Sequence, residues 1–310
     1  MIKKVFHAIC NDNLHTRRLI AENLSVSTVT VGKAVDSLID ANIISASGKT
    51  SEGAGRRSDF LDISSYNKIL LISLDAHGFC YSLSDMGGGI YICRLSYVES
   101  LDYVDNISIL ITHLKKRMGC KPLKTIVALP GDLQDGRMIN TYISDYSGAR
   151  IDETFESNGI VVDQYLPFSD AIRASGRISD GDVFISIGNN VWGDIGRGRI
   201  ECWDSVSIDA KGELTIRDAI RSCGGEERLF EYVCRFVKLT DSFFSPTRIS
   251  LSTDRMGEAI KERLGSSIEK LMLVNADELI FEGAYKIAVE KILEEIKLKN
   301  EKALALCQKV

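Results

Sequence analysis

The sequence predicts an α/β protein in which a small N-terminal unit of helices and two short strands precedes a longer body of alternating strands and helices. Three observations lead to this prediction. Two short helical patterns joined by a tight turn occupy residues 15–44, and two short strand patterns then flank a glycine-rich segment. From residue 68 onward, alternating apolar runs and amphipathic helical patterns follow one another, as they do in α/β proteins. With 310 residues the chain exceeds one ordinary core, so two or three domains are expected.

The first helix is predicted in residues 15–24, "HTRRLIAENL". Thr16 can cap its N-terminus, and Leu19 and Ile20 give it an apolar face. Only the tight connection "LSVS" separates it from the next helical pattern.

The second helix is predicted in residues 27–44, "STVTVGKAVDSLIDANII". Ser27 is a natural N-cap, because its hydroxyl can accept a hydrogen bond from the free N–H groups of the first turn. The buried stripe, at spacings i, i+4 and i+7, consists of Val31, Val35 and Leu38. The opposite face is small and polar and consists of Thr28, Gly32, Lys33 and Asp36. A glycine inside a helix costs about 1 kcal/mol relative to alanine, which is tolerable where a partner must approach closely.

Two helices joined by a short turn, the second with a small polar leading end, form the helix-turn-helix pattern. In this motif the second helix lies in the major groove of DNA, with its N-terminal residues at the base edges. The residues expected to contact DNA from this helix are Ser27, Thr28, Thr30, Gly32 and Lys33. The alternative is an ordinary helical hairpin that does not bind DNA.

The segments "NIISASGK" and "SDFLDIS" that follow are predicted to be two short strands. Two strands joined by a glycine-rich loop after a helix-turn-helix form a winged helix. Lys49, Arg56 and Arg57 are therefore expected to contact phosphate groups or the minor groove, where the negative potential is strongest. The alternative is a solvated linker that happens to be basic. A nucleotide P-loop is a poor alternative, because it needs a Lys-Ser/Thr after the glycines and a strand-loop-helix context, and neither is present.

The stretch "HTRRLIAENLSVSTVTVGKAVDSLIDANII", followed by "GAGRRSDFLDIS", resembles the N-terminal part of ROK-family transcriptional repressors. The resemblance implies a winged helix-turn-helix domain in residues 1–65 and a two-lobed, actin/hexokinase-like (ROK) body in residues 66–310. The first lobe would span about 66–175 and the second 176–310, with a closing helix that packs back on the body. The body is shorter than is usual for regulators of this family, and Arg57 stands where the wing usually has proline.

The body resembles the sugar-kinase-like part of that family, but its phosphate-binding elements differ. Where the kinases carry Asp-x-Gly-Gly-Thr, this sequence keeps Asp75 and has Phe79 in place of the threonine. The family's Gly-Thr-Gly run has become Gly188-Asn189-Asn190, which is typical of a hairpin turn, and its Gly-Gly-Gly loop has become Ser252-Thr253-Asp254. Asp170 matches the catalytic aspartate of the kinases. Because phosphoryl transfer depends on positioning the phosphates, we expect no catalysis and no cofactor.

ROK proteins commonly carry a zinc loop with three cysteines and one histidine, which form a closed tetrahedral site. In this sequence only Cys223 is in register, while Arg221 and Arg228 stand where the other two cysteines would be and Asp204 replaces the histidine. One thiolate cannot hold zinc, so no structural metal is expected.

The resemblance implies a DNA-binding transcriptional regulator of the repressor type that binds double-stranded DNA as a homodimer or higher homo-oligomer. A cleft between the lobes would take a sugar or sugar-derived effector, with Asp170, Asn189, Trp192 and Glu201 as candidate lining residues. Each of these has a structural alternative: a helix-start carboxylate, a turn amide, a core aromatic and a surface acid. Two other functions stay open, namely a sugar kinase with an appended N-terminal domain and a regulator whose body binds no small molecule.

The composition is 45% hydrophobic and 26% charged, as in soluble globular proteins, and the net charge of −5 argues against general coating of nucleic acid. The first residues carry too short an apolar run for a signal peptide, and no apolar segment is long enough for a membrane span. The eight cysteines form no Cys-x-x-Cys pair and are expected to be reduced thiols of a cytoplasmic protein.

Overall fold

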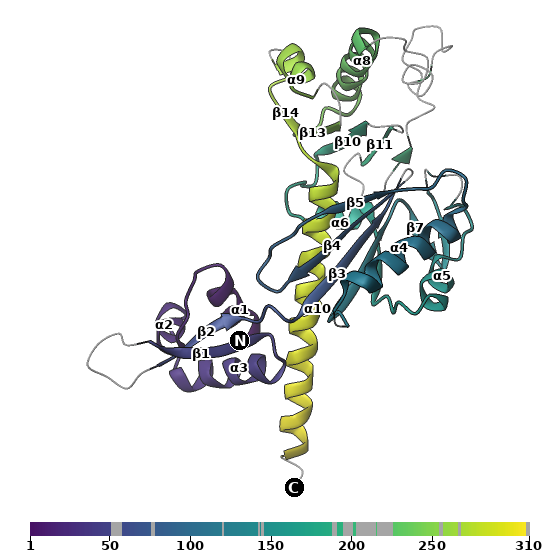
Figure 1. Ribbon diagram of the computed structural model, residues 1–310. Coiled ribbons are helices and arrows are strands. Elements are labelled where there is room, and N and C mark those ends of the chain that lie inside the picture. Colours follow the sequence, from purple (N-terminus) through teal and green to yellow (C-terminus); the bar gives the residue numbers. More distant parts are fainter. Residues whose placement is uncertain are drawn as a thin grey trace.

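The computed structural model describes residues 1–50, 58–75, 78–119, 121–141, 143, 146–187, 191–194, 201–202, 215, 226–253, 257–265 and 268–307. For residues 48–50, 58, 201–202, 226–229 and 303–307 only the backbone is described. Figure 1 shows the N-terminal unit (residues 1–65) beside the lower half of one long helix, and the sheets of the body (residues 66–310) around its upper half.

The described part of the N-terminal unit begins with three helices: α1 (Ile2–Cys10), α2 (Arg17–Asn23) and α3 (Thr28–Asp40). The Thr16 hydroxyl accepts a hydrogen bond from the Leu19 N–H, with an N···O distance of 3.3 Å. The Ser27 hydroxyl accepts from the Thr30 N–H in the same way, at 3.1 Å. Both predicted N-caps are therefore confirmed, and each fixes where its helix begins.

The predicted apolar stripe of α3 is confirmed, since Val31, Val35 and Leu38 are all fully buried. The prediction for α2 is only half right. Ile20 is fully buried, whereas Leu19 is 36% exposed. Neighbouring residues on an α-helix point about 100° apart, so a short helix with a narrow contact face buries one of the two and leaves the other at the edge.

Strands β1 (Ile44–Thr50) and β2 (Ser58–Ile63) pair antiparallel, from Ile44 opposite Ile63 to Thr50 opposite Ser58. The two predicted short strands are confirmed. The register shifts between Ser47 and Lys49, which marks an irregularity toward the far end of the pair. The N–H of Leu61 donates to the carbonyl of His15 at 2.8 Å and so ties β2 to the segment before α2.

The first sheet of the body has five strands in the spatial order β5-β4-β3-β6-β9. Their bounds are β3 (Lys68–Leu74), β4 (Gly78–Asp85), β5 (Cys93–Ser96), β6 (Lys124–Leu129) and β9 (Gln164–Pro167). The first three pair antiparallel, and β6 and β9 then add in parallel. A small antiparallel pair, β7 (Asp132–Gln134) and β8 (Arg137–Ile139), follows β6.

Helices cover both faces of this sheet. Along β3, Ile69 and Leu71 belong to one buried cluster, and Leu70 and Ile72 belong to another. This alternation follows from the two-residue period of a strand, and burial on both faces explains why β3 is apolar almost throughout. One face carries α4 (Tyr103–Arg117) and α5 (Ile151–Ser157), which lie on the same side in Figure 1.

The second sheet has the order β12-β11-β10-β13-β14. Its strands are β10 (Val183–Ile187), β11 (Val191–Asp194), β12 (Glu201–Cys202), β13 (Ile249–Thr253) and β14 (Leu271–Leu273). Here too the first three strands pair antiparallel and the last two add in parallel. Both sheets therefore share the strand order 3-2-1-4-5, counted in chain order within each sheet. Helices α8 (Glu226–Phe244) and α9 (Gly257–Gly265) pack on one face of the second sheet.

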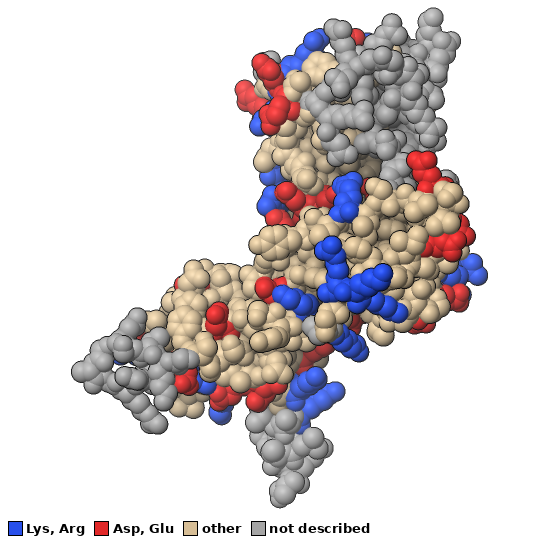
Figure 2. Space-filling view, viewed as in Figure 1, with Lys and Arg blue, Asp and Glu red and all other residues tan. Residues whose placement is uncertain are grey.

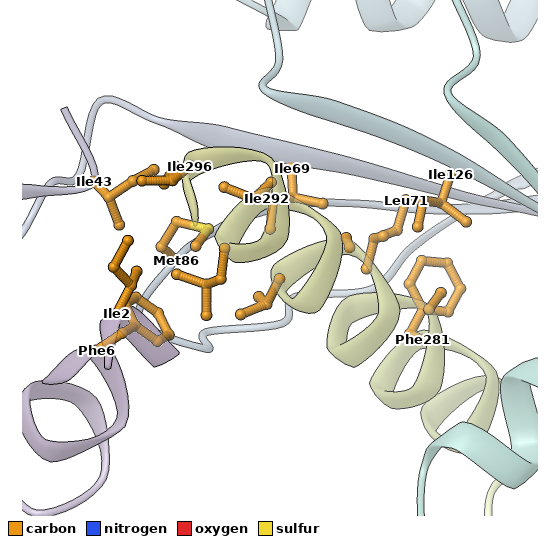
Figure 3. Packing of buried hydrophobic residues seen from close by; sticks show 14 of the residues in the cluster. Ile2, Phe6, Ile43, Ile69, Leu71, Met86, Ile126, Phe281, Ile292 and Ile296 are labelled. Atoms are coloured by element: carbon orange, nitrogen blue, oxygen red, sulfur yellow. The ribbon is translucent and has the colours of Figure 1, made fainter. Parts of the chain in front are cut away.

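Two further helices connect these parts. The short helix α6 (Phe168–Ala174) directly follows β9, and α10 (Ala276–Cys307) closes the described chain. The closing helix packs back on the first sheet and on α6, as predicted for the closing helix of the body. Figure 3 shows that its lower part also packs against the N-terminal unit, where Ile296 lies beside Ile43, and Ile292 belongs to the same cluster as Ile2 and Phe6. One hydrophobic cluster therefore runs from the N-terminal unit into the body.

Within the described part of the chain, no helix is both long enough and apolar enough to cross a membrane. Four cysteines have described side chains, and all four are free: Cys10, Cys80, Cys93 and Cys234. Burial raises the pKa of Cys10 to about 12, and that of Cys80 likewise to about 12. These two thiols are therefore kept protonated at neutral pH, which suits core packing rather than reaction.

Candidate functional site

The outward face of α3 is the first candidate site. Ser27, Thr28, Thr30 and Lys33 are all exposed. The Ser27 Oγ and Thr30 Oγ1 atoms lie 2.8 Å apart, so these two hydroxyls already bond to each other. Thr28 and Lys33 therefore offer the more readily available polar groups on this face.

Gly32 lies in the middle of the same face. A Cβ atom added at this position would have no heavy atom within 4 Å, apart from its chain neighbours and the backbone of its own helix. The packing of the described residues therefore gives no reason for a glycine here, although glycine destabilises a helix interior. A surface without a side chain is instead suited to close approach by another molecule.

Val29 was not among the residues predicted to take part. It is 69% exposed, next to Thr28 in the first turn of α3. The sequence could have revealed this exposure. Val29 lies two positions before the buried Val31, so its side chain points to a different side of the helix. An exposed methyl-bearing side chain beside polar ones is the kind of group that contacts thymine methyls in a major groove.

Arg17 fixes the position of α3 relative to the strand pair β1–β2. Its guanidinium reaches Asp36 on α3 at 2.9 Å and Asp59 on β2 at 3.3 Å. The sequence analysis placed Asp36 on the polar face of the helix but assigned it no function. In the structure it is one end of a bridge that links α2, α3 and β2.

The basic residues expected at the tip of the strand pair are only partly within the described structure. Lys49 lies in β1, opposite Asp59, and is described through its backbone alone. Arg56 and Arg57 lie outside the described residues.

The second candidate site surrounds Asp170, which is exposed in the first turn of α6. Partial burial of the carboxyl group and the nearby charge of Asp132 raise the pKa of Asp170. Arg173 acts in the opposite direction, and Asp194 adds a smaller increase. Three carboxyl groups from α6, β7 and β11 therefore lie close enough to influence one another.

Arg173 compensates part of this negative charge. Its Nε lies 3.3 Å from Asp194, a buried carboxylate, and its Nη1 lies 2.8 Å from the exposed Asp180. The pair with Asp194 joins α6 to the second sheet. Because Asp194 is buried, this ion pair sets the position of α6 more strongly than a surface pair would.

The other predicted cleft residues do not gather around Asp170 in the described structure. Trp192 is 6% exposed, and its ring lies 5.7 Å from that of Phe168 and 5.3 Å from that of Phe184. It occupies the core, which corresponds to the structural alternative for this residue. Glu201 is described only through its backbone in β12, and Asn189 lies outside the described residues.

The glycine and phenylalanine at the start of β4 have structural roles. Phe79 is buried, and its ring meets that of Tyr97 edge-on at 4.6 Å. A Cβ at Gly78 would lie 2.4 Å from the carbonyl oxygen of Leu95 on β5, so glycine is required there for the strands to pair. Neither position carries a polar side chain for a phosphate. Among the described residues, no group of three or more His, Cys, Asp or Glu side chains could hold a metal ion.

The sequence matches no protein-family model and no curated protein. Among solved structures it is similar to a ROK family transcriptional regulator, described as a homolog of the E. coli MLC protein. The two chains are 14% identical, with a TM-score of 0.57, and the match covers 94% of this chain and 98% of that one.

Two kinases are similar over a shorter part. The inorganic polyphosphate/ATP-glucomannokinase from Arthrobacter sp. strain KM is 15% identical, with a TM-score of 0.51, over 74% of this chain and 99% of its own. The ROK family glucokinase from Streptomyces griseus, in complex with glucose and AMPPNP, is 13% identical, with a TM-score of 0.50, over 72% of this chain and 100% of its own. At these identities the likeness establishes the fold. The chain has the mixed α/β fold of ROK proteins, and the expected resemblance is confirmed at that level.

Proposed function

We propose that the chain is a sequence-specific DNA-binding transcriptional regulator of the repressor type. In this proposal residues 1–65 form a winged helix-turn-helix domain. Residues 66–310 form a catalytically inactive, two-lobed ROK-like body, with lobes of about 66–175 and 176–310. The body serves for dimerisation and for binding an effector.

The observation that carries the proposal is the outward face of α3. It combines exposed small polar residues with a glycine whose missing side chain is explained by no contact with the described residues. A reading helix needs this combination, because it must let base edges come close to its backbone while offering donors and acceptors to them. An ordinary helical hairpin would gain about 1 kcal/mol from alanine at Gly32.

The arrangement around α3 supports the same reading. The pair β1–β2 follows α3 directly, as the wing of a winged helix does, and Arg17 fixes it to α2 and α3. We propose that Lys49, Arg56 and Arg57 contact phosphate groups or the minor groove from this wing. The solved regulator matches 94% of this chain, a share that residues 66–310 alone could not supply.

For the body we propose an effector role without catalysis. Phe79 fills the core at the position where the resemblance puts a phosphate-binding threonine. Asp170 is exposed on α6 and is a candidate contact for a sugar or sugar-derived effector, since a glucokinase of the same fold holds glucose. An effector would act only if it binds two arrangements of the body with different affinity.

The first test is binding of the purified protein to DNA from upstream of its own gene, measured by fluorescence anisotropy at two salt concentrations with scrambled DNA as competitor. Specific binding that weakens with salt is expected. The double variant Arg56→Ala/Arg57→Ala should weaken binding to every sequence and flatten the salt slope by about one unit per lost phosphate contact. Changes at Thr28 or Lys33 should instead alter which sequence is preferred.

The competing function is a sugar kinase with an appended domain, favoured by the exposed Asp170 with its raised pKa. It predicts ADP release from ATP in the presence of a panel of hexoses and N-acetylhexosamines. ADP release that Asp170→Asn abolishes, together with no DNA binding, would replace the regulator proposal.

A further inference from the structure

The long helix α10 contacts the N-terminal unit and both sheets of the body. At its start, the Ala276 N–H donates to the Ser252 hydroxyl of the second sheet at 3.0 Å. One residue later, Asp277 accepts hydrogen bonds from Arg94 and from the Cys80 thiol of the first sheet. A helix of 32 residues is about 48 Å long, which is enough to join the sheets to the N-terminal unit.

The tightest contact of α10 is with α6. A Cβ at Gly283 would lie 1.6 Å from the carbonyl oxygen of Ala171, so only glycine allows the two helices to cross this closely. Two polar contacts flank the crossing: Arg177 pairs with Glu282 at 2.6 Å, and the Lys286 ammonium donates to the Ser175 carbonyl. Helix α6 therefore cannot shift without moving α10 or breaking this contact.

About 14–20 Å further along the helix, α10 packs against the N-terminal unit. Ile292 and Ile296 are buried in the cluster that contains Ile2 and Phe6 of α1 (Figure 3). Lys3 pairs with Glu294 at 3.0 Å on the surface of the same contact. Burying an isoleucine side chain stabilises by about 1.5–3 kcal/mol, so this contact is strong enough to position α1.

A groove of about 1050 Å³ runs between α1 and α10, above this contact. Its walls include Phe6 and His7 of α1, Tyr285 of α10 and the glycine pair Gly87-Gly88 after β4. Close-packed interiors move as blocks rather than deform smoothly. The groove leaves space for α1 and α10 to move relative to each other as rigid blocks.

We propose that α10 is the lever that transmits a change at Asp170 to the N-terminal unit. Asp170 immediately precedes Ala171, whose carbonyl meets Gly283. A ligand that binds to Asp170 displaces the first turn of α6. The close crossing at Gly283 passes this displacement on to α10. The contact of α10 with the cluster that contains Ile2 and Phe6 then reorients α1. This inference rests on the proposed function, since it describes how the body would regulate DNA binding.

The test uses Gly283→Ala, which forces α6 and α10 apart in the absence of any ligand. Gly265→Ala in α9 is the matched control, since a Cβ there has no neighbour within 4 Å among the described residues. Amide hydrogen exchange of residues 2–10 is measured first and needs no DNA. We expect it to accelerate about tenfold or more in Gly283→Ala, since an overpacked contact opens more readily, and to be unchanged in Gly265→Ala. The affinity for DNA should change by a similar factor in the first variant only.

Faster exchange in α6 combined with wild-type exchange in residues 2–10 would overturn the lever, because the clash would then be absorbed locally. Should Gly283→Ala fail to fold, Lys286→Met removes a milder contact at the same crossing, and the same comparison applies. Absence of DNA binding by the wild-type protein would refute the proposed function alone, since the exchange experiment still decides whether α6 and α1 are coupled.

Discussion

Replacing Gly32 by alanine is expected to make the protein more stable and its binding to DNA weaker. The stability effect follows from helix propensity. Gly32 lies in the interior of α3, and an added Cβ would find no atom within 4 Å. Alanine should therefore stabilise the folded state by about 1 kcal/mol, because it restricts the unfolded chain and meets no obstacle in the folded one.

The effect on DNA has the opposite sign. In the proposed complex the backbone at Gly32 lies against the edge of the major groove, and a methyl group would intrude on that contact. Overpacking a close contact costs roughly 1–3 kcal/mol, which corresponds to a loss of about five- to 150-fold in affinity. Few substitutions separate a binding role from a folding role so clearly, because most changes that damage a site also destabilise the fold.

Urea unfolding followed by circular dichroism measures the first effect, and fluorescence anisotropy with specific DNA measures the second. Gly265→Ala is the control, since it should leave DNA binding unchanged. A Gly32→Ala variant that binds DNA as tightly as the wild type would refute the close approach at α3. A Gly32→Ala variant that is less stable than the wild type would refute the finding that the space around Gly32 is empty.

Three further outcomes follow from the structure. Thr16→Ala removes the N-cap of α2 and should lower the unfolding free energy by about 1 kcal/mol in urea titrations. Arg248→Met leaves Asp182, which is 3% exposed, without its ion-pair partner at 2.5 Å, and should cost about 3–5 kcal/mol, seen as a large drop in Tm. Because the pKa of Asp170 is raised above its ordinary 3.8, its favourable contribution to stability is complete below pH 3.8 and is lost as the pH rises through the folded-state pKa. Asp170→Asn should therefore be more stable than the wild type at pH 7 and equal to it below pH 3.8, in urea titrations at both pH values.

The local signals in the sequence predicted local structure well. Thr16 and Ser27 cap their helices because a hydroxyl just before a helical run has few better partners than the free N–H groups of the first turn. The stripe of Val31, Val35 and Leu38 is buried because a period of 3.6 residues puts them on one side. These features depend on neighbours within a few residues, and a single sequence contains that information.

Features that depend on distant parts of the chain were not predictable in the same way. Trp192 was a candidate for the cleft, but Phe168 and Phe184 enclose it in the core. Nothing near Trp192 in the sequence indicates those partners. Likewise, the alternating strands and helices did not reveal that both sheets share one strand order, because parallel pairing joins segments that are far apart in the chain.

Gly32 and Gly283 show what the structure adds to the sequence. Both lie inside helices, and both cost about the same free energy relative to alanine, so helix propensity gives no ground for treating them differently. In the structure, an internal contact explains Gly283, because its missing side chain makes room for the carbonyl of Ala171. Gly32 has no neighbour of this kind. A glycine that destabilises its helix and serves no internal contact points to a partner outside the chain, and the polar residues around Gly32 are of the types that read the edges of DNA bases.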